Sequence, residues 1–283
     1  MLRFSDSIYA VGARQNAGIC RPAGRGGAAR ARQWGAFMPE APALSVVIPA
    51  FNEQDNLEPL VAELAPILDQ LGLAWELLFV NDASTDASAD VLARLMTAEP
   101  RIRVITHRIN SGQSAALASG FRLARGRLVL TLDADLQNDP ADIPHYLAAL
   151  EDGVHCVCGY RARRKQGWLR RFASRTANRF RATVTGDWLN DAGCNFRLLR
   201  REALAEIPVF NGMHRFLPTL LKAQSGVVRE IRINDRPRQA GVSNYGINDR
   251  LWRGLADCFA VRWYQRRALR FDRAVELTAR RQS

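Results

Sequence analysis

The chain of 283 residues is 47% hydrophobic and 24% charged, the balance of a globular protein with one large domain or two small ones. No stretch approaches the roughly 18 consecutive apolar residues that a membrane-spanning helix needs, so no spanning helix is expected. The formal net charge of +12 predicts an anionic partner: nucleic acid, an anionic membrane surface or a phosphorylated substrate. The five cysteines are odd in number and show no CxxC spacing, which indicates reduced thiols in a cytosolic compartment.

Residues 1–38 are expected to lie outside the folded domain. The stretch from Met1 to Phe37 is rich in Gly, Ala and Arg, nearly free of acid and without apolar periodicity, as disordered segments are. It could be an Arg-rich organelle-targeting segment. Translation could equally begin at Met38, directly before the first predicted strand, which would make these residues a non-native extension. We favour the second interpretation.

Strands and helices alternate from Leu44 onward. Apolar, β-branched runs predict buried strands, and leucines spaced three or four residues apart predict amphipathic helices between them. The predicted strands are Leu44–Pro49, Trp75–Val80, Arg103–Thr106 and Arg127–Leu132, and the helices cover 57–71, a segment up to Thr97, and 111–124. Repeated β-α units of this length predict a doubly wound, mostly parallel sheet.

Polar side chains follow three of these strands directly: Asn52 and Glu53, then Asp82, then Asp133 and Asp135. Open α/β sheets bind ligands at the carboxyl ends of their strands. Two carboxylates one residue apart suit a hard divalent cation, with substrate phosphates as further ligands. Each cluster alone could be a helix cap or a solvated turn. Three clusters at strand ends of one sheet favour a binding site, and the lack of GxGxxG and P-loop motifs argues against dinucleotide and P-loop chemistry.

The second half of the chain is more basic. After a predicted helix from Pro140 to Leu150 and a strand from Val154 to Tyr160, residues 161–181 carry many Arg side chains, no acid and interleaved aromatic residues. Such a segment could lie on an anionic bilayer, line a phosphate channel or be a solvated helix face. A strand over Val227–Ile233 and a final helix over Asn248–Arg267 follow, joined by an Arg- and Gly-containing stretch that suits either a phosphate-closing lid or a plain loop.

Five motifs in this order resemble the family 2 glycosyltransferases of the dolichol- or polyprenyl-phosphate sugar transferase type. They are SVVIPAFNE (45–53), VNDASTD (80–86), TLDADLQ (131–137), GCNFRLLRR (193–201) and RPRQAGVSNYG (236–246), within a resemblance that covers about 44–267. The resemblance implies a GT-A-type, Rossmann-like single domain over 39–246, followed by a C-terminal amphipathic helix and tail over 247–283. The chain departs from the family pattern at Asn81, Ala83 and Asn244, where Asp, Gly and Lys are frequent.

The resemblance also implies roles for individual residues. The residues that would bind the nucleotide-sugar are Pro49, Ala50, Asn52, Glu53, Asp82 and Asp133, and those that would bind the metal, Mg²⁺ or Mn²⁺, are Asp135 and Gln137. The residues that would bind the acceptor phosphate are Arg161, Arg164, Arg197, Arg236 and Ser243. The implied catalytic residues are Asp133, Asp135, Arg197 and Arg238.

The implied reaction is inverting transfer of a sugar from a UDP- or GDP-linked donor to a polyprenyl-phosphate lipid. A phosphate acceptor is already ionised near neutral pH and needs no general base, because its second pKa is about 6. The alternative is a saccharide hydroxyl acceptor in cell-envelope polysaccharide synthesis, for which Asp191 is the candidate base. We expect no nucleic-acid partner. Many family members carry carboxyl-terminal membrane spans. Because no spanning helix is expected here, we expect peripheral contact with the cytoplasmic face of an anionic membrane, or contact through an integral partner.

Overall fold

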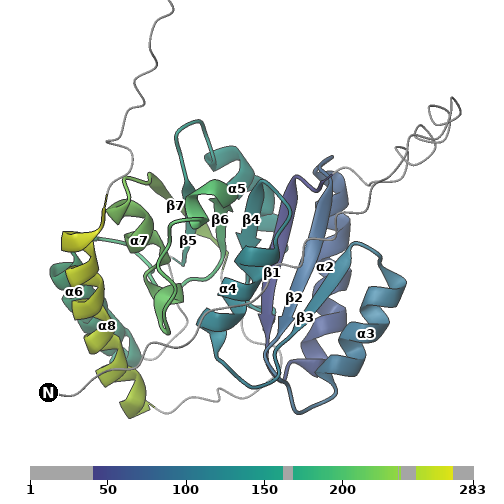
Figure 1. Ribbon diagram of the computed structural model, residues 1–283, viewed down its shortest axis with the longest axis horizontal. Helices are drawn as coiled ribbons and strands as arrows, with labels where there is room; N and C mark the ends of the chain where they lie inside the picture. Colours follow the sequence, from purple (N-terminus) through teal and green to yellow (C-terminus); the bar gives the residue numbers. More distant parts are fainter. Residues whose placement is uncertain (1–40, 162–167, 235, 237–246, 270–283) are drawn as a thin grey trace, which may run out of the picture. The chain divides into compact units, whose positions relative to one another are not determined.

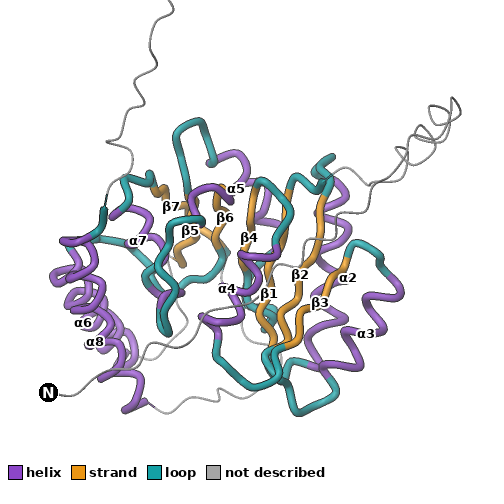
Figure 2. Tube along the Cα trace, in the orientation of Figure 1, coloured by secondary structure: helices purple, strands orange, loops and turns teal. Residues whose placement is uncertain are grey.

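The computed structural model describes residues 41–161, 168–234, 236 and 247–269. Its centre is a seven-stranded sheet in the order β3-β2-β1-β4-β6-β5-β7, with helices on both faces (Figures 1 and 2). The strands are β1 (Leu44–Ala50), β2 (Trp75–Asn81), β3 (Ile102–Thr106), β4 (Leu128–Thr131), β5 (Cys156–Arg161), β6 (Arg197–Arg200) and β7 (Val228–Ile233). The α-helices are α2 (Gln54–Gln70), α3 (Ser88–Ala98), α4 (Gln113–Leu123), α5 (Ile143–Ala149), α6 (Trp168–Thr185), α7 (Leu217–Ala223) and α8 (Ile247–Arg267), and three short 3-10 turns are η1 (Pro140–Asp142), η2 (Arg201–Leu204) and η3 (Met213–Arg215).

The prediction of a mostly parallel sheet is confirmed. β1 pairs in parallel with β2 on one side and with β4 on the other, and β2 pairs in parallel with β3. β6 is the exception, since it runs antiparallel to both β4 and β5. The sequence analysis treated this segment as part of a motif and not as a strand. Four residues with arginine at both ends do not give the apolar run from which a buried strand is recognised.

Alternation along β1 divides the core between the two faces of the sheet. Leu44, Val46 and Ile48 pack on one face with the leucines of α2, all of them fully buried. Val47 points to the other face, where α4, η3, α7 and α8 cover the sheet. Both faces of the sheet are thereby closed around β1, β2 and β4, which explains why these central strands are largely apolar without a polar face.

The carboxyl ends of β1, β2 and β4 lie at the same edge of the sheet because these strands are adjacent and parallel. Among the described residues, four that are not glycine have a positive φ, and three of them, Asn52 (57°), Ala83 (57°) and Leu136 (59°), lie in the loops after these strands. This backbone conformation is unfavourable for residues with a Cβ and persists where surrounding contacts enforce it. The predicted binding edge is therefore also where backbone strain is concentrated.

Candidate active site

The loops after β1 and β2 are tied together by side chains of the predicted nucleotide motifs. The Asn52 carboxamide oxygen accepts a hydrogen bond from the Thr85 backbone N–H at 2.8 Å, and the Ser84 hydroxyl accepts one from the Asn52 N–H at 3.0 Å. Glu53 is the N-cap residue of α2, but its side chain makes no capping hydrogen bond. The helix-cap alternative therefore does not describe Asn52 or Glu53. Pro49 and Ala50 form the end of β1 beside this interlocked pair of loops.

Asp82 organises the next loop. Its buried carboxylate accepts hydrogen bonds from the backbone N–H groups of Ser111 at 2.9 Å and Gly112 at 2.6 Å, and it lies 2.7 Å from Nδ1 of His107. These contacts fix the start of α4, where Gly112 has a φ of 84°. The predicted nucleotide-binding carboxylate thus also sets the position of the helix that follows, so that Gln113 reaches the end of β4.

Asp133 lies at the centre of the site, just beyond β4. One of its carboxylate oxygens accepts hydrogen bonds from the side-chain amides of Gln113 at 2.8 Å and Asn195 at 3.3 Å. Burial and the charge of Asp135 raise the pKa of Asp133 to about 6, although Asn195 and the nearby Arg197 act in the opposite direction. Two neutral amides therefore hold this carboxylate in place without neutralising its charge.

Asp135 is buried, and one of its oxygens accepts a hydrogen bond from the Gln137 backbone N–H at 3.2 Å across the strained Leu136. No group of three or more His, Cys, Asp or Glu side chains among the described residues is arranged to hold a metal. The carboxylate of Asp135 and the carboxamide of Gln137 nevertheless fit Mg²⁺ or Mn²⁺, which usually take one or two carboxylates and complete their octahedral shell with water and substrate phosphate. These two side chains complete a metal site only when the substrate supplies further oxygen ligands.

Arg197 is 1% exposed and lies behind the carboxylates. Its guanidinium donates hydrogen bonds to the backbone oxygens of His214 at 2.6 Å and Ala192 at 3.1 Å, and no described atom accepts from its Nε. The sequence prediction that it binds the acceptor phosphate stays a prediction. In this structure the guanidinium contacts the protein interior and stabilises the loop that carries Asn195.

Two other predicted phosphate-binding arginines are engaged by carboxylates. Arg161 Nε lies 2.8 Å from one oxygen of Asp191, whose other oxygen accepts a hydrogen bond from the Gly193 N–H at 3.2 Å. Arg236 contacts Glu63 at 2.6 Å and Asp139 at 2.7 Å. Burial opposes its charge, but these two carboxylates outweigh that effect and raise the pKa of Arg236 above its usual range. The predicted residues Arg164, Arg238 and Ser243 lie outside the described residues.

Several residues that shape this site were not predicted from the sequence. Gln113 and Asn195 were not singled out, although Gln113 directly follows Gly112 and Asn195 lies two residues after Gly193. Ser114 was also missed: its hydroxyl contacts Nδ1 of His214 at 2.7 Å and accepts a hydrogen bond from the Gly212 N–H at 2.9 Å. A carboxamide next to a glycine at the start of a predicted helix was the available signal for Gln113.

The sequence profile described as Glycosyl transferase family 2 matches residues 45–208, which include the loops after β1, β2 and β4 and the loop that carries Asn195. The chain belongs to glycosyl transferase family 2. The family predicted from the five motifs is thereby confirmed.

Curated relatives of this family 2 chain carry the names of polyprenyl-phosphate sugar transferases. It is 36% identical over 228 residues to a dodecaprenyl-phosphate galacturonate synthase of Rhizobium johnstonii, an alignment that covers 79% of this chain and 67% of the relative. It is 36% identical over 206 residues to an undecaprenyl-phosphate 4-deoxy-4-formamido-L-arabinose transferase of Edwardsiella ictaluri, covering 72% of this chain and 63% of the relative. The alignments thus span about two thirds of the length of these relatives.

Among solved structures, the family 2 chain resembles glucosyl-3-phosphoglycerate synthase from Mycobacterium tuberculosis, solved in complex with Mn²⁺, UDP and phosphoglyceric acid. The TM-score is 0.61 at 19% identity, over 87% of this chain and 84% of that one. At this identity the likeness shows the shared fold, a mostly parallel sheet with flanking helices.

Proposed function

We propose that this chain is an inverting, metal-dependent glycosyltransferase that moves a sugar from a UDP- or GDP-linked donor to the phosphate of a polyprenyl-phosphate lipid. The observation that carries the proposal is the placement of Asp133 and Asp135 at the end of β4, next to the loops after β1 and β2, in a family 2 chain. The names of the curated relatives support the lipid-phosphate acceptor.

The donor would lie against the carboxyl ends of β1, β2 and β4. Pro49, Ala50, Asn52, Glu53 and Asp82 would shape the nucleotide site. Asp135 and Gln137 would hold Mg²⁺ or Mn²⁺, which supplies positive charge where the leaving nucleoside diphosphate becomes more negative. The structure gives Asp133 a defined orientation through Gln113 and Asn195, so its carboxylate needs little reorganisation to meet the donor sugar.

The acceptor would be bound by arginines from several segments. We assign this role to Arg161, Arg164, Arg236 and Ser243, and we place Arg238 in the catalytic set. Arg161 and Arg236 would have to exchange their present carboxylate partners for phosphate oxygens, a change that bidentate guanidinium geometry permits. For the buried Arg197 we favour action through Asp133 and the loop of Asn195 over direct contact.

A hydroxyl acceptor with Asp191 as general base is the second candidate. A base needs a carboxylate oxygen that can receive a proton from the nucleophile. Asp191 is buried, and its two oxygens are engaged by Arg161 and by the Gly193 N–H. This arrangement favours a phosphate acceptor. The variant Asp191→Asn distinguishes the two acceptors: transfer activity is abolished if Asp191 is the base, and only reduced if Asp191 is an ion-pair partner of Arg161.

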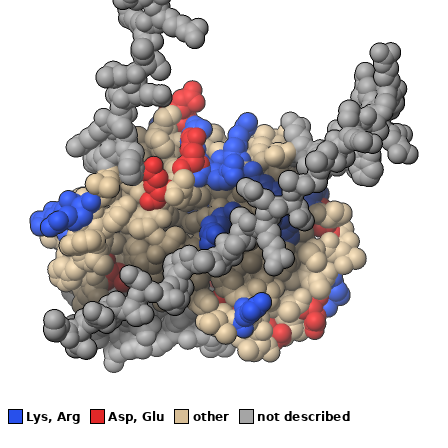
Figure 3. Space-filling view, viewed as in Figure 1, with Lys and Arg blue, Asp and Glu red and all other residues tan. Residues whose placement is uncertain are grey.

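We also propose that the chain works on the cytoplasmic face of an anionic membrane, through α8 and the region around α6. No helix of the described residues is long and apolar enough to cross a membrane. Four large aromatic side chains exposed among the described residues, Phe180, Trp188, Phe259 and Trp263, belong to α6, α8 or the segment after α6; we call them the aromatic edge. Phe180 and Phe259 are in edge-to-face contact at 6.2 Å. Basic side chains gather where α8 ends (Figure 3), a combination typical of membrane-surface helices.

In this proposal residues 39–246 are the catalytic domain, residues 247–283 form an amphipathic C-terminal element, and residues 1–38 take no part in catalysis. An integral membrane partner is compatible with the same surface. Nucleic acid is not an expected partner.

The test is transfer of label from a panel of radiolabelled UDP- and GDP-sugars into organic-extractable lipid, with Mg²⁺ or Mn²⁺ present. Label in the lipid phase that mild acid releases supports the proposal, and nucleotide release without lipid product supports the hydroxyl acceptor. Asp135→Asn is expected to abolish transfer, while Asp152→Asn, which changes an exposed carboxylate in the turn before β5, leaves transfer unchanged. Near-normal turnover of Asp135→Asn at saturating metal would contradict the assigned metal site.

A further inference from the structure

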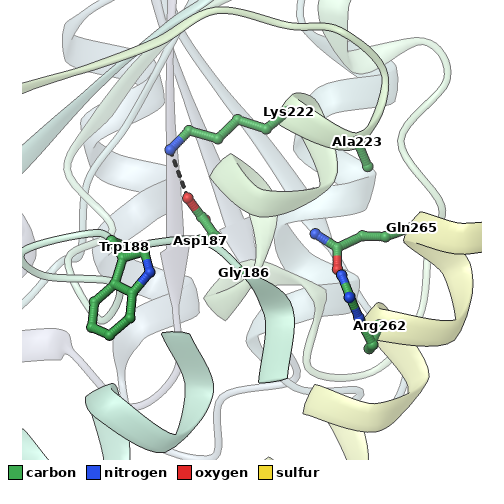
Figure 4. A pocket seen from close by; sticks show the side chains of 7 residues that line it. All are labelled: Gly186, Asp187, Trp188, Lys222, Ala223, Arg262 and Gln265. Carbon is green, nitrogen blue, oxygen red and sulfur yellow. Dashed lines mark hydrogen bonds and ion pairs between the residues drawn. The ribbon is translucent and has the colours of Figure 1, made fainter. Parts of the chain in front are cut away.

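A second cavity lies away from the donor site, between the segment after α6, the end of α7 and the last turns of α8. Its volume is about 450 Å³, and its lining includes Asp187, Trp188, Lys222, Arg262 and Gln265 (Figure 4). None of the residues assigned above to donor, metal or acceptor lines it.

The charge around this cavity is positive. Asp187 is its one acidic lining residue, and its carboxylate is already engaged: Lys222 Nζ lies 2.6 Å from one oxygen and Thr219 donates to the other at 2.6 Å. The buried Arg181 lies behind it, 3.8 Å from the second oxygen. Within the described part of the chain, Arg262 has no carboxylate partner. Two cations, Lys222 and Arg181, therefore already lie beside this carboxylate, and an anion in the cavity would meet Arg262 and the remaining protons of Lys222.

Gln265 adds a second requirement. It lines the cavity, and its side-chain N–H donates to the backbone oxygen of Thr185 at 3.0 Å. Its carboxamide oxygen is buried and no described group donates to it, so a turn of this side chain would present the oxygen to a ligand in the cavity. A buried acceptor without a donor costs free energy, which a ligand with a hydroxyl group would recover. The lining thus suits a phosphate that has a hydroxyl group nearby.

The cavity opens beside the aromatic edge. Trp188, at its rim, is 69% exposed. On α8, Arg262 follows Phe259 by three residues and directly precedes Trp263, so it lies between the exposed aromatic face and Gln265 on the inner side of the helix. Aromatic side chains of this kind favour the headgroup level of a bilayer, where they would place the cavity against lipid phosphates.

We propose that this cavity is a headgroup site for an anionic phospholipid whose phosphodiester is followed by a hydroxyl-bearing alcohol, such as phosphatidylglycerol. The inference rests on the proposed membrane-surface location. The phosphate would be bound by Arg262 and Lys222, a headgroup hydroxyl would donate to Gln265, and Trp188 would lie along the glycerol and the first acyl carbons. The site would hold the chain on the membrane in one orientation, independently of donor and metal.

The test is sedimentation of the full chain with vesicles of phosphatidylcholine that contain phosphatidylglycerol, without donor or metal. Arg262→Gln is expected to lower vesicle affinity at least tenfold. Arg266→Gln removes the same charge from the exposed side of the same helix and is the matched control. A basic residue that acts only through the membrane surface potential contributes up to about fivefold to vesicle affinity. Equal losses in the two variants would overturn the headgroup site.

Two further arms identify the ligand. Vesicles with phosphatidylmethanol have the same charge but no headgroup hydroxyl, so wild type should bind them more weakly than phosphatidylglycerol, and Gln265→Met should bind both alike. If wild type binds both equally, the hydroxyl contact is wrong.

Glycerol 3-phosphate in solution should not raise the melting temperature at millimolar concentration; if it does so in wild type and not in Arg262→Gln, the ligand is a soluble phosphate and the lipid assignment is overturned. Asp135→Asn should bind vesicles as wild type does, which separates failure of this site from failure of the proposed transfer.

Discussion

Replacing Arg197 by methionine tests whether this arginine contacts the acceptor or supports the site from behind. The side chain is 1% exposed, and the change removes two hydrogen bonds to backbone oxygens, those of the part-buried His214 and the buried Ala192. Each unsatisfied acceptor away from water costs about 1–3 kcal/mol, so the two together cost about 2–6 kcal/mol. Methionine keeps most of the aliphatic volume, so little cavity cost is added. We expect the free energy of unfolding to fall by about 3–5 kcal/mol, which for a domain of this size lowers the melting temperature by roughly 6–20 °C.

The assay combines denaturant unfolding with steady-state kinetics below the new melting temperature. Because Arg197 reaches the substrate through Asp133 and the loop of Asn195, we expect lower kcat and weaker donor binding, with no selective rise in the acceptor KM. Arg200→Met is the matched control. Arg200 lies on the same strand and also donates to two backbone oxygens, but its side chain is 30% exposed, so water can replace those bonds. Its replacement should cost less than about 1 kcal/mol.

An Arg197→Met protein as stable as Arg200→Met would refute the supporting role of Arg197. A large rise in the acceptor KM, with unchanged stability and donor KM, would instead restore the direct phosphate contact that the sequence predicted. Rescue of that acceptor KM by Arg197→Lys would strengthen this opposite conclusion.

Three further predictions concern the loops and the core. Ala83→Gly should raise the free energy of unfolding by about 1 kcal/mol, because Ala83 has a φ of 57°, whereas Ala87→Gly, at a φ of −76°, should lower it. Gln113→Leu should raise the donor KM, measured at saturating acceptor, because Asp133 loses one of its two amide donors. Burial alone would raise the pKa of Glu76, but hydrogen bonds from Ser45, Arg103 and the Arg125 N–H outweigh it and hold the pKa below the ordinary 4.5. The stability that Glu76 contributes is therefore present above pH 4.5 and lost as the pH falls through its lower folded-state pKa. Glu76→Gln should make the free energy of unfolding less dependent on pH in this range.

Each of these has a result that would contradict it. Equal destabilisation by glycine at both alanines would mean that the backbone strain at position 83 carries no cost. A normal donor KM for Gln113→Leu would reduce the Gln113 contact to packing. Identical pH profiles for wild type and Glu76→Gln would show that this carboxylate titrates alike in the folded and unfolded chain.

Periodicity alone was enough to predict most of the fold. The strands at 44–50, 75–81 and 128–131 are largely apolar runs, and the leucines of α2 recur at helical spacing, so burial on both faces of a parallel sheet can be read directly from the residues. β6 could not be found in this way. It is four residues long, it carries arginine at both ends, and it becomes a strand only because β4 and β5 leave a place between them.

The sequence by itself determined the edge of the sheet where the site lies and the carboxylates that mark it, because strand ends and DxD spacing are local features. Only the tertiary structure decided what each charged side chain contacts. Arg197 is buried behind Asp133, Asp191 is paired with Arg161, and amides from α4 and from the loop before β6 meet the same carboxylate. These partners come from segments far apart in the chain. Burial and pairing depend on how those segments pack, so no local pattern contains them.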